Sequence, residues 1–339
     1  MQQLPRVSLL VTGGTITMTR SAAGGITPTL TGADLVAAVP ELAHHAELDV
    51  HSYSQKPGAS LTLEDLLAIA QLAREQFAQG AHGVVVVQGT DTIEETAFVL
   101  DMLLASDRPV VVTGAMRGPQ TPGADGPANL LASVIVAGSE AMCGQGALVV
   151  LNDEVHAARH VRKSHTVSTA AFASPGFAPL ATVVEGRVEV FARIARSPAL
   201  ALPSDPVTPA PVALVSAVLG DDGRMLPHLP QMGYRGAVIE AMGAGHLPAT
   251  WVAQVQALAD KMPVVLATRV KAGRVLEQTY GFPGSEMDLI QKGLIPAGHL
   301  SGPKACLLLR LLLACGVAQG ELAAFIRRAG ALSGPLRSF

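Results

Sequence analysis

The most constraining feature of this chain is a series of short runs rich in valine, isoleucine, leucine and alanine. These apolar runs lie at residues 7–11, 83–87, 109–114, 147–153, 212–218, 236–242 and 263–269. Segments with helix-period apolar residues separate several of them, at 61–80, 92–106, 250–262 and 303–316. Strands that alternate with helices predict an α/β fold with a mostly parallel sheet.

The composition agrees with two domains of this kind. At 339 residues the chain is long for a single domain. Hydrophobic residues make up 49% and charged residues 15%, which allows a large buried core. Only 4% of residues are aromatic, so we expect an aliphatic core like that of parallel sheets covered by helices.

Residues 196–212 interrupt the alternation of strands and helices. They contain five prolines and show neither the helical period nor the two-residue period of a strand. We therefore predict a larger N-terminal domain at 1–195, a linker at 196–211 and a smaller C-terminal α/β domain at 212–339. The N-terminal sheet is expected to carry helices on both faces. Residues 182–194 alternate around a Glu-Gly turn, which predicts a β-hairpin.

Charge and hydropathy exclude some classes of partner. The net charge of −3 provides no general basic field for nucleic acid. No apolar run reaches the roughly 18–20 residues of a membrane span. The first apolar run is too short for a signal peptide, and three cysteines in apolar contexts are typical of a reducing compartment. The sequence therefore predicts a cytoplasmic protein that binds neither nucleic acid nor membranes.

Three strand ends carry residues suited to a ligand site, because loops at the carboxyl ends of parallel strands line a crevice. They are "TGGTI" at 12–16, "GTDT" at 89–92 and "GAMR" at 114–117. Neither GxGxxG nor GxxxxGK[ST] follows these strands, which argues against nucleotide binding. An ordinary strand exit explains any one of them, but three together favour a functional site.

The residue types at these strand ends favour nucleophilic catalysis. A threonine hydroxyl in "TGGTI" can attack a carbonyl when a base assists it, and nearby backbone N–H groups can stabilise the oxyanion. The "GTDT" stretch adds a second hydroxyl beside a carboxylate, which can bind an ammonium group. Lys163 is the candidate base, although a lone lysine on a loop is more often a solvated surface residue without a catalytic role.

Together these motifs resemble the bacterial-type L-asparaginases, the asparaginase/glutaminase family. The resemblance covers nearly the whole chain in one order, through "TGGTI", "GTDTIEETA", "GAMR", "ADGPANL", "LVVLND" and "AGHL…KA". It implies two α/β domains and a homotetramer, a dimer of dimers, whose active sites lie between the N-domain of one subunit and the C-domain of its neighbour. It also implies hydrolysis of L-asparagine to L-aspartate and ammonia without metal or cofactor, with some activity on L-glutamine.

The resemblance also assigns roles to individual residues. Thr15 is similar to the primary nucleophile, which forms an acyl-enzyme ester. Thr90, Asp91 and Lys163 are similar to the second hydroxyl, the ammonium-binding carboxylate and the base, which act as a unit. The substrate-binding residues that it implies are Gly58, Ala59, Ser60, Gly89, Thr90, Asp91, Ala115 and Glu286.

The lid that follows "TGGTI" departs from the family pattern. The family usually places a tyrosine there that touches the nucleophile, whereas residues 17–32 contain none. The corresponding position falls near Ile26 or Thr27. Three explanations stay open: a tyrosine from elsewhere, reliance on the Lys163 side, or help from another hydroxyl of the lid, namely Thr17, Thr19, Ser21 or Thr27.

Two further regions leave alternatives. In the family, a Ser-Gln or Ser-Ser/Ala pair binds the substrate carboxylate. Ser54-Gln55 matches this pair by residue type, and residues 58–60 match it by their distance to the next helix. We favour the second alignment. In the C-terminal half, His246 stands where the family often has asparagine. The carboxylate from the neighbouring subunit is expected within 279–289, with Glu286 preferred over Tyr280.

The remaining predictions concern a metal site and the alternative functions. His156, His160 and His165 cluster without a matching ligand pattern, so we predict no metal site. The alternatives to an asparaginase are a glutaminase, the amidase subunit of an amidotransferase, and an asparagine- or aspartate-binding protein of the same fold with weakened catalysis. The missing lid tyrosine is the only support for the last of these.

Overall fold

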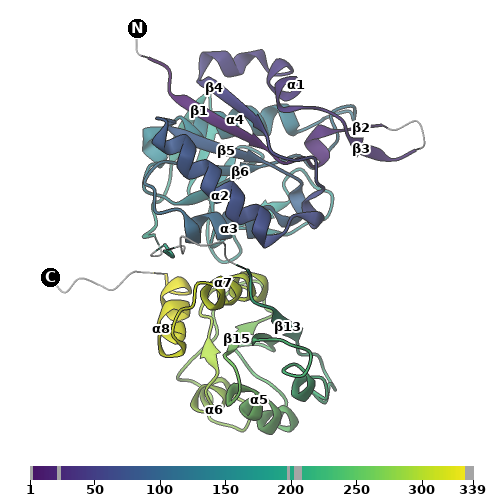
Figure 1. Ribbon diagram of the computed structural model, residues 1–339, viewed down its shortest axis with the longest axis vertical. Helices are drawn as coiled ribbons and strands as arrows, with labels where there is room; N and C mark the ends of the chain where they lie inside the picture. Colours follow the sequence, from purple (N-terminus) through teal and green to yellow (C-terminus); the bar gives the residue numbers. More distant parts are fainter. Residues whose placement is uncertain (1–2, 21–23, 197–198, 202–207, 333–339) are drawn as a thin grey trace, which may run out of the picture. The chain divides into compact units, whose positions relative to one another are not determined.

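The computed structural model describes residues 3–20, 24–196, 199–201 and 208–332 (Figure 1). The chain divides into two compact units, Met1–Ala199 and Leu200–Phe339. Half of the predicted linker at 196–211 lies outside the described residues, as does Ser21 of the predicted lid. No helix in the described ranges combines the length and apolar character that crossing a bilayer requires.

The N-terminal unit is built on an eight-stranded sheet in the order β12-β11-β8-β7-β6-β5-β1-β4. Its strands are β1 (Arg6–Val11), β4 (Glu47–Ser52), β5 (Gly83–Val87), β6 (Val110–Thr113), β7 (Ala147–Leu151), β8 (Glu154–Ala157), β11 (Ala181–Val184) and β12 (Arg187–Val190). The five strands from β4 to β7 are parallel, and β8, β11 and β12 continue the sheet antiparallel. The prediction of a mostly parallel sheet is confirmed.

Helices cover both faces of this sheet, as predicted. Helices α1 (Gly32–Ala37) and α4 (Gly126–Ala137) share a buried cluster with alternate residues of β1 and β5, among them Leu9 and Val85. Helices α2 (Leu63–Ala78) and α3 (Ile93–Leu103) pack against each other and lie on the opposite face (Figure 1). The predicted hairpin is formed by β11 and β12, and its turn places Glu185 and Gly186 at φ of 49° and 72°.

Two short ribbons lie beside the main sheet. Strands β2 (Met18–Arg20) and β3 (Ile26–Pro28) form a ribbon that extends from the body of the N-terminal unit (Figure 1). Strands β9 (Arg162–Lys163) and β10 (Phe172–Ala173) form the other. The first ribbon lies within the predicted lid, and the second carries Lys163.

The C-terminal unit has a four-stranded parallel sheet in the order β13-β14-β15-β16. Its elements are β13 (Val212–Ser216), β14 (Gly236–Ala241), β15 (Val264–Thr268), β16 (Ile295–Pro296), α5 (Val252–Ala259), α6 (Glu286–Gln291), α7 (Gly302–Ala314) and α8 (Gln319–Ala329). Helix α7 packs on β13, β14 and β15, whereas α5 belongs to a buried cluster centred on Trp251. The predicted smaller α/β domain is therefore confirmed.

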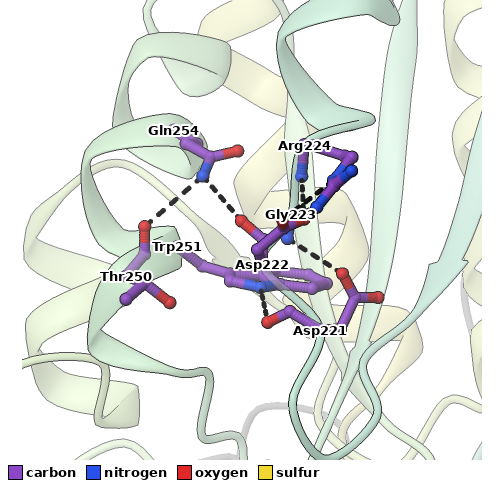
Figure 2. A network of polar contacts seen from close by, with 7 residues as sticks. All are labelled: Asp221, Asp222, Gly223, Arg224, Thr250, Trp251 and Gln254. Atoms are coloured by element: carbon purple, nitrogen blue, oxygen red, sulfur yellow. Dashed lines mark hydrogen bonds and ion pairs between the residues drawn. The ribbon is translucent and has the colours of Figure 1, made fainter.

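A loop after β13 closes over Trp251 (Figure 2). The indole Nε1 donates to the carbonyl of Asp221 at 2.8 Å, and Gln254 Nε2 donates to the carbonyl of Asp222, also at 2.8 Å. Gly223 has φ of 69°, and a Cβ there would lie 3.0 Å from the indole ring. Only a residue without a side chain fits this loop against the ring.

The predicted strands and helices are all present, but several elements were missed. Strand β4 and helices α1, α4, α6 and α8 were not predicted. The sequence of α4 is apolar almost all round, and most of its residues are buried, so it shows little helical periodicity. Helices α1 and α6 are only six residues long, which is too short for a periodic pattern.

Candidate active site

The site begins where the neighbouring parallel strands β1 and β5 end. Gly14 follows β1 at φ of 92°, and a Cβ on it would lie 2.2 Å from the backbone nitrogen of Gly89, which follows β5. A side chain at Gly14 would therefore clash with backbone as well as strain the turn. This close packing brings the stretches "TGGTI" and "GTDT" into contact.

The predicted carboxylate loop reaches the same point. A Cβ on Gly58 would lie 2.7 Å from the carbonyl oxygen of Gly89, and Thr92 Oγ1 donates to the carbonyl of Gly58 at 2.9 Å. Gly58 is buried, whereas Ala59 and Ser60 are exposed on a single 3₁₀ turn. Three segments far apart in the sequence thus meet through backbone contacts of Gly14, Gly58 and Gly89.

The threonines of "TGGTIT" differ in how they are held. Thr12 is fully buried and donates to the carbonyl of Val87 at 3.1 Å. Thr17 is also buried, and its hydroxyl donates to the carbonyl of Gly14 at 2.8 Å. Thr15 is half-buried, and its hydroxyl has no hydrogen-bond partner among the residues that the structure describes. Of the three hydroxyls, Thr15 is therefore the one available to a substrate.

Lys163 lies beside the second predicted hydroxyl. Its Nζ is 2.9 Å from Thr90 Oγ1 and 2.8 Å from Asp91 Oδ1. The side chain of Lys163 is 17% exposed and that of Asp91 is 65% exposed, so the pair opens to solvent on the Asp91 side. The backbone N–H of Lys163 donates to Glu94 Oε1 at 3.3 Å, which attaches β9 to the start of α3. The structure thus brings Thr90, Asp91 and Lys163 together.

The "GAMR" loop is positioned by two residues whose role was not predicted. Asp125 accepts hydrogen bonds from the N–H groups of Met116 and Arg117, at 2.9 and 2.8 Å. Asn129 Nδ2 donates to the carbonyl of Gly114 at 3.0 Å. These bonds fix the loop at Ala115, which is fully buried. The signal was present in "ADGPANL", which contains both residues.

The predicted lid contains the β2–β3 ribbon. Thr19 and Thr29 share a hydrogen bond of 2.8 Å between their hydroxyls, and the N–H of Arg20 donates to Gln120 Oε1 at 3.0 Å. The aligned positions Ile26 and Thr27 lie on β3. No tyrosine occurs in this ribbon.

Two family models match the chain. The model "Asparaginase, N-terminal" matches residues 6–196. The model "Glutaminase/Asparaginase C-terminal domain" matches residues 211–325. The chain belongs to the asparaginase family. It is accordingly an amidohydrolase of the asparaginase class.

Individual relatives agree with this family. The L-asparaginase of Bacillus licheniformis is 33% identical over 312 residues, 91% of this chain and 95% of that protein. The probable L-asparaginase of Deinococcus radiodurans is 38% identical over 333 residues, 94% and 96% of the two chains. One component of the glutamyl-tRNA(Gln) amidotransferase of Methanosarcina barkeri is 30% identical over 302 residues, 87% of this chain and 70% of that protein.

A solved structure has the same fold. The crystal structure of a probable cytoplasmic L-asparaginase from Campylobacter jejuni superposes with a TM-score of 0.84 at 30% sequence identity. The match covers 96% of this chain and 99% of that one.

The C-terminal unit of this asparaginase holds Glu286 in the interior. Its side chain is fully buried, and Oε1 accepts from the N–H groups of Thr279 and Tyr280 at 3.0 and 2.7 Å. His246 Nε2 lies 3.2 Å from Oε2. Burial alone would raise the pKa of Glu286, but the hydrogen bonds from Tyr280, Thr279 and His246 outweigh it and hold that pKa below its usual value. Tyr280 is 41% exposed, so this loop presents Tyr280 outward and Glu286 inward.

Ser54 of the alternative carboxylate loop, and the histidines considered as metal ligands, contact other residues of the N-terminal unit. Ser54 Oγ donates to the carbonyl of Thr12 at 2.8 Å. His156 is buried on β8, with Nδ1 3.0 Å from Ser174 Oγ, whereas His160 stacks on Phe177 with ring centroids 3.8 Å apart. Within the described ranges, no three His, Cys, Asp or Glu side chains are grouped so that they could hold a metal ion.

Proposed function

We propose that this asparaginase hydrolyses L-asparagine to L-aspartate and ammonia through an acyl-enzyme ester on Thr15. The observation that carries the proposal is the position of Lys163 Nζ, 2.9 Å from Thr90 Oγ1 and 2.8 Å from Asp91 Oδ1. The contact between Gly14 and Gly89 holds the half-buried Thr15 in the segment next to Thr90. A nucleophile, a second hydroxyl, a base and a carboxylate therefore belong to one site.

The reaction has two half-reactions. Thr15 Oγ1 attacks the side-chain carbonyl carbon of asparagine, the C–N bond breaks, and the nitrogen leaves as ammonia with the proton from Thr15. Backbone N–H groups next to the glycines stabilise the oxyanion of the tetrahedral intermediate. A water molecule, activated through Thr90, then attacks the ester and releases L-aspartate, and the proton returns to Thr15.

Lys163 is the proposed base. Its Nζ lies within hydrogen-bond distance of both Asp91 and Thr90. The α-ammonium group of asparagine can bind Asp91 in place of Lys163, which leaves Lys163 to accept a proton from Thr90.

The remaining proposed contacts with the substrate come from the loops around Gly58, Gly89 and Ala115. The turn formed by Gly58, Ala59 and Ser60 binds the α-carboxylate through backbone N–H groups and the Ser60 hydroxyl. Gly89 and Ala115 line the substrate with their backbone. L-Glutamine, which is one methylene longer, is a poorer substrate of the same site. No metal or cofactor takes part.

The assembly completes the site. We propose a cytoplasmic homo-oligomer, a dimer of dimers, in which the loop 279–289 of one subunit reaches the neighbour's substrate. Glu286 is the contact expected from the sequence, but its side chain is fully buried, so we propose Tyr280, which is 41% exposed, as the contact. An active site shared by two subunits makes at least a dimer necessary for activity.

One observation favours a second candidate, a binding protein of the same fold with weakened catalysis. The lid ribbon lacks a tyrosine, and the hydroxyl of Thr17 is already bonded to the carbonyl of Gly14. Such a protein would bind L-aspartate and L-asparagine but release little ammonia.

The test is ammonia release from L-asparagine and L-glutamine by single variants. Thr15→Ala is expected to lower kcat roughly 10⁴-fold or more, and Thr90→Val roughly 10³-fold, with the fold retained. Thr182→Val is the matched control, because Thr182 lies on β11 and its hydroxyl donates to the carbonyl of Asp153. Full activity in both site variants would sink the threonine mechanism, and L-aspartate binding without turnover in the wild type would favour the binding protein.

A further inference from the structure

The loop 53–62, which joins β4 to α2, carries the turn 58–60 and is bonded to the nucleophile segment at its start. The N–H of Lys56 and the hydroxyl of Ser54 both donate to the carbonyl of Thr12, at 2.9 and 2.8 Å. A Cβ on Gly13 would lie 2.6 Å from the carbonyl oxygen of Lys56. The first half of the loop is therefore attached to the segment "TGGTI".

The second half of the loop is fixed to the start of α2. Thr62 is the N-cap, and its hydroxyl accepts the N–H of Asp65 at 3.2 Å. Asp65 Oδ2 accepts the N–H of Thr62 at 2.9 Å in return, which completes a capping box. Because α2 has 16 residues, this end of the loop has a rigid base.

Asp65 joins the two halves through an ion pair with Lys56 and a hydrogen bond of 3.5 Å from the hydroxyl of Tyr53. Lys56 Nζ lies 2.8 Å from both Oδ1 and Oδ2 of Asp65, and we call this pair the Lys56–Asp65 clasp. Burial alone would raise the pKa of Asp65, but the hydrogen bonds from Lys56 and Thr62 outweigh it and lower that pKa. The Asp65 side chain is 11% exposed and the Lys56 side chain is 44% exposed, so solvent reaches the pair from the Lys56 side and screens it in part.

We propose that the Lys56–Asp65 clasp is a positioning device for the turn 58–60 and, through it, for the α-carboxylate of the substrate. The inference rests on the proposed function, because it takes this turn as the carboxylate site. The exposed residues of the turn, Ala59 and Ser60, lie between the two bonded halves of the loop. The clasp connects these two halves. A loop closed in this way has fewer conformations to lose when an anion binds.

The expected signature is a change in KM rather than in kcat. The clasp is proposed to hold the α-carboxylate equally in the ground state and the transition state, and the loss of such uniform binding raises KM without lowering kcat. Lys56→Met is expected to raise KM for L-asparagine about tenfold and to leave kcat within about twofold. Competitive inhibition by L-aspartate should weaken by the same factor, whereas inhibition by β-alanine, which lacks the α-carboxylate, should not change.

Two variants calibrate this result. Lys56→Arg keeps a cation that can bind both oxygens of Asp65, so it is expected to restore KM to within about twofold of the wild type. Arg224→Met breaks an exposed ion pair with Asp222 in the C-terminal unit and is expected to change neither constant. If Lys56→Met does not fold, Lys56→Gln carries the same comparison.

Each outcome decides one proposal. A folded Lys56→Met protein with wild-type KM overturns the clasp and leaves the proposed function standing, and so does a fall in kcat at unchanged KM. A wild-type protein that releases no ammonia overturns the proposed function. The clasp is then judged by L-aspartate binding in a calorimeter, where equal affinity of wild type and Lys56→Met, or no binding by the wild type, overturns it.

Discussion

Two polar networks of this asparaginase are built from similar residues but are held in different ways. Around Lys163, side chains bond to other side chains, and Asp91 is 65% exposed. Around Trp251, side chains bond to backbone carbonyls of the loop that contains Asp221 and Asp222 (Figure 2). Trp251 itself is fully buried.

The difference indicates what each network does. A hydrogen bond to an exposed side chain, such as that of Asp91, can open and exchange its partner for a ligand at little cost. A bond from a buried side chain to a backbone carbonyl leaves an unsatisfied acceptor when it breaks, which costs about 1–3 kcal/mol. We therefore expect the Lys163 network to control activity and the Trp251 network to control stability.

Among variants of these two networks, the largest effect is expected for Lys163→Met. Removing the base and the donor to Thr90 should lower kcat for L-asparagine roughly 10³-fold. The free energy of unfolding should change by no more than about 1 kcal/mol, because the lost ion pair is partly exposed. Ammonia release and urea unfolding measure the two quantities. A large loss of stability at unchanged kcat would break the comparison.

The reverse pattern is expected for Trp251→Phe. The variant loses the bond to the Asp221 carbonyl and part of the buried ring, which should lower the free energy of unfolding by about 2 kcal/mol. The kcat of the folded protein should stay within about twofold of the wild type. Since Trp251 is the single tryptophan, unfolding is followed by circular dichroism. A tenfold loss of kcat with unchanged stability would contradict this assignment.

The smallest effect is expected for Asp222→Asn. The hydrogen bonds from Arg224 lower the pKa of Asp222 from 3.8 to about 2, so its stabilising contribution is complete above pH 4 and is lost as the pH falls towards 2. The side chain of Arg224 is 86% exposed and that of Asp222 is 50% exposed, so Tm at pH 6 should fall by no more than about 2 °C.

Differential scanning calorimetry at pH 6, 4 and 3, in low and high salt, tests the Asp222 prediction. The difference in Tm between wild type and Asp222→Asn should shrink below pH 4 and at high salt. A difference that grows as the pH falls would show that the sign is wrong.

Much of the fold could be predicted from the sequence because its signals are local. The run 83–87 is apolar and β-branched at almost every position, and it forms the fully buried strand β5. Residues 61–80 have helical periodicity and form α2. By contrast, α4 is apolar nearly all round, so only its packing between sheet and surface identifies it as a helix.

The candidate site divides in the same way. The sequence by itself determined the α/β class, the order of the motifs and the family, because these depend on periodicity and on short stretches such as "TGGTI" and "GTDT". Only the tertiary structure decided that Gly14, Gly58 and Gly89 pack backbone to backbone, and that Lys56 reaches Asp65. The glycine contacts join segments that are far apart along the chain, and they depend on how the strands are ordered in the sheet. No local pattern in the sequence records that order.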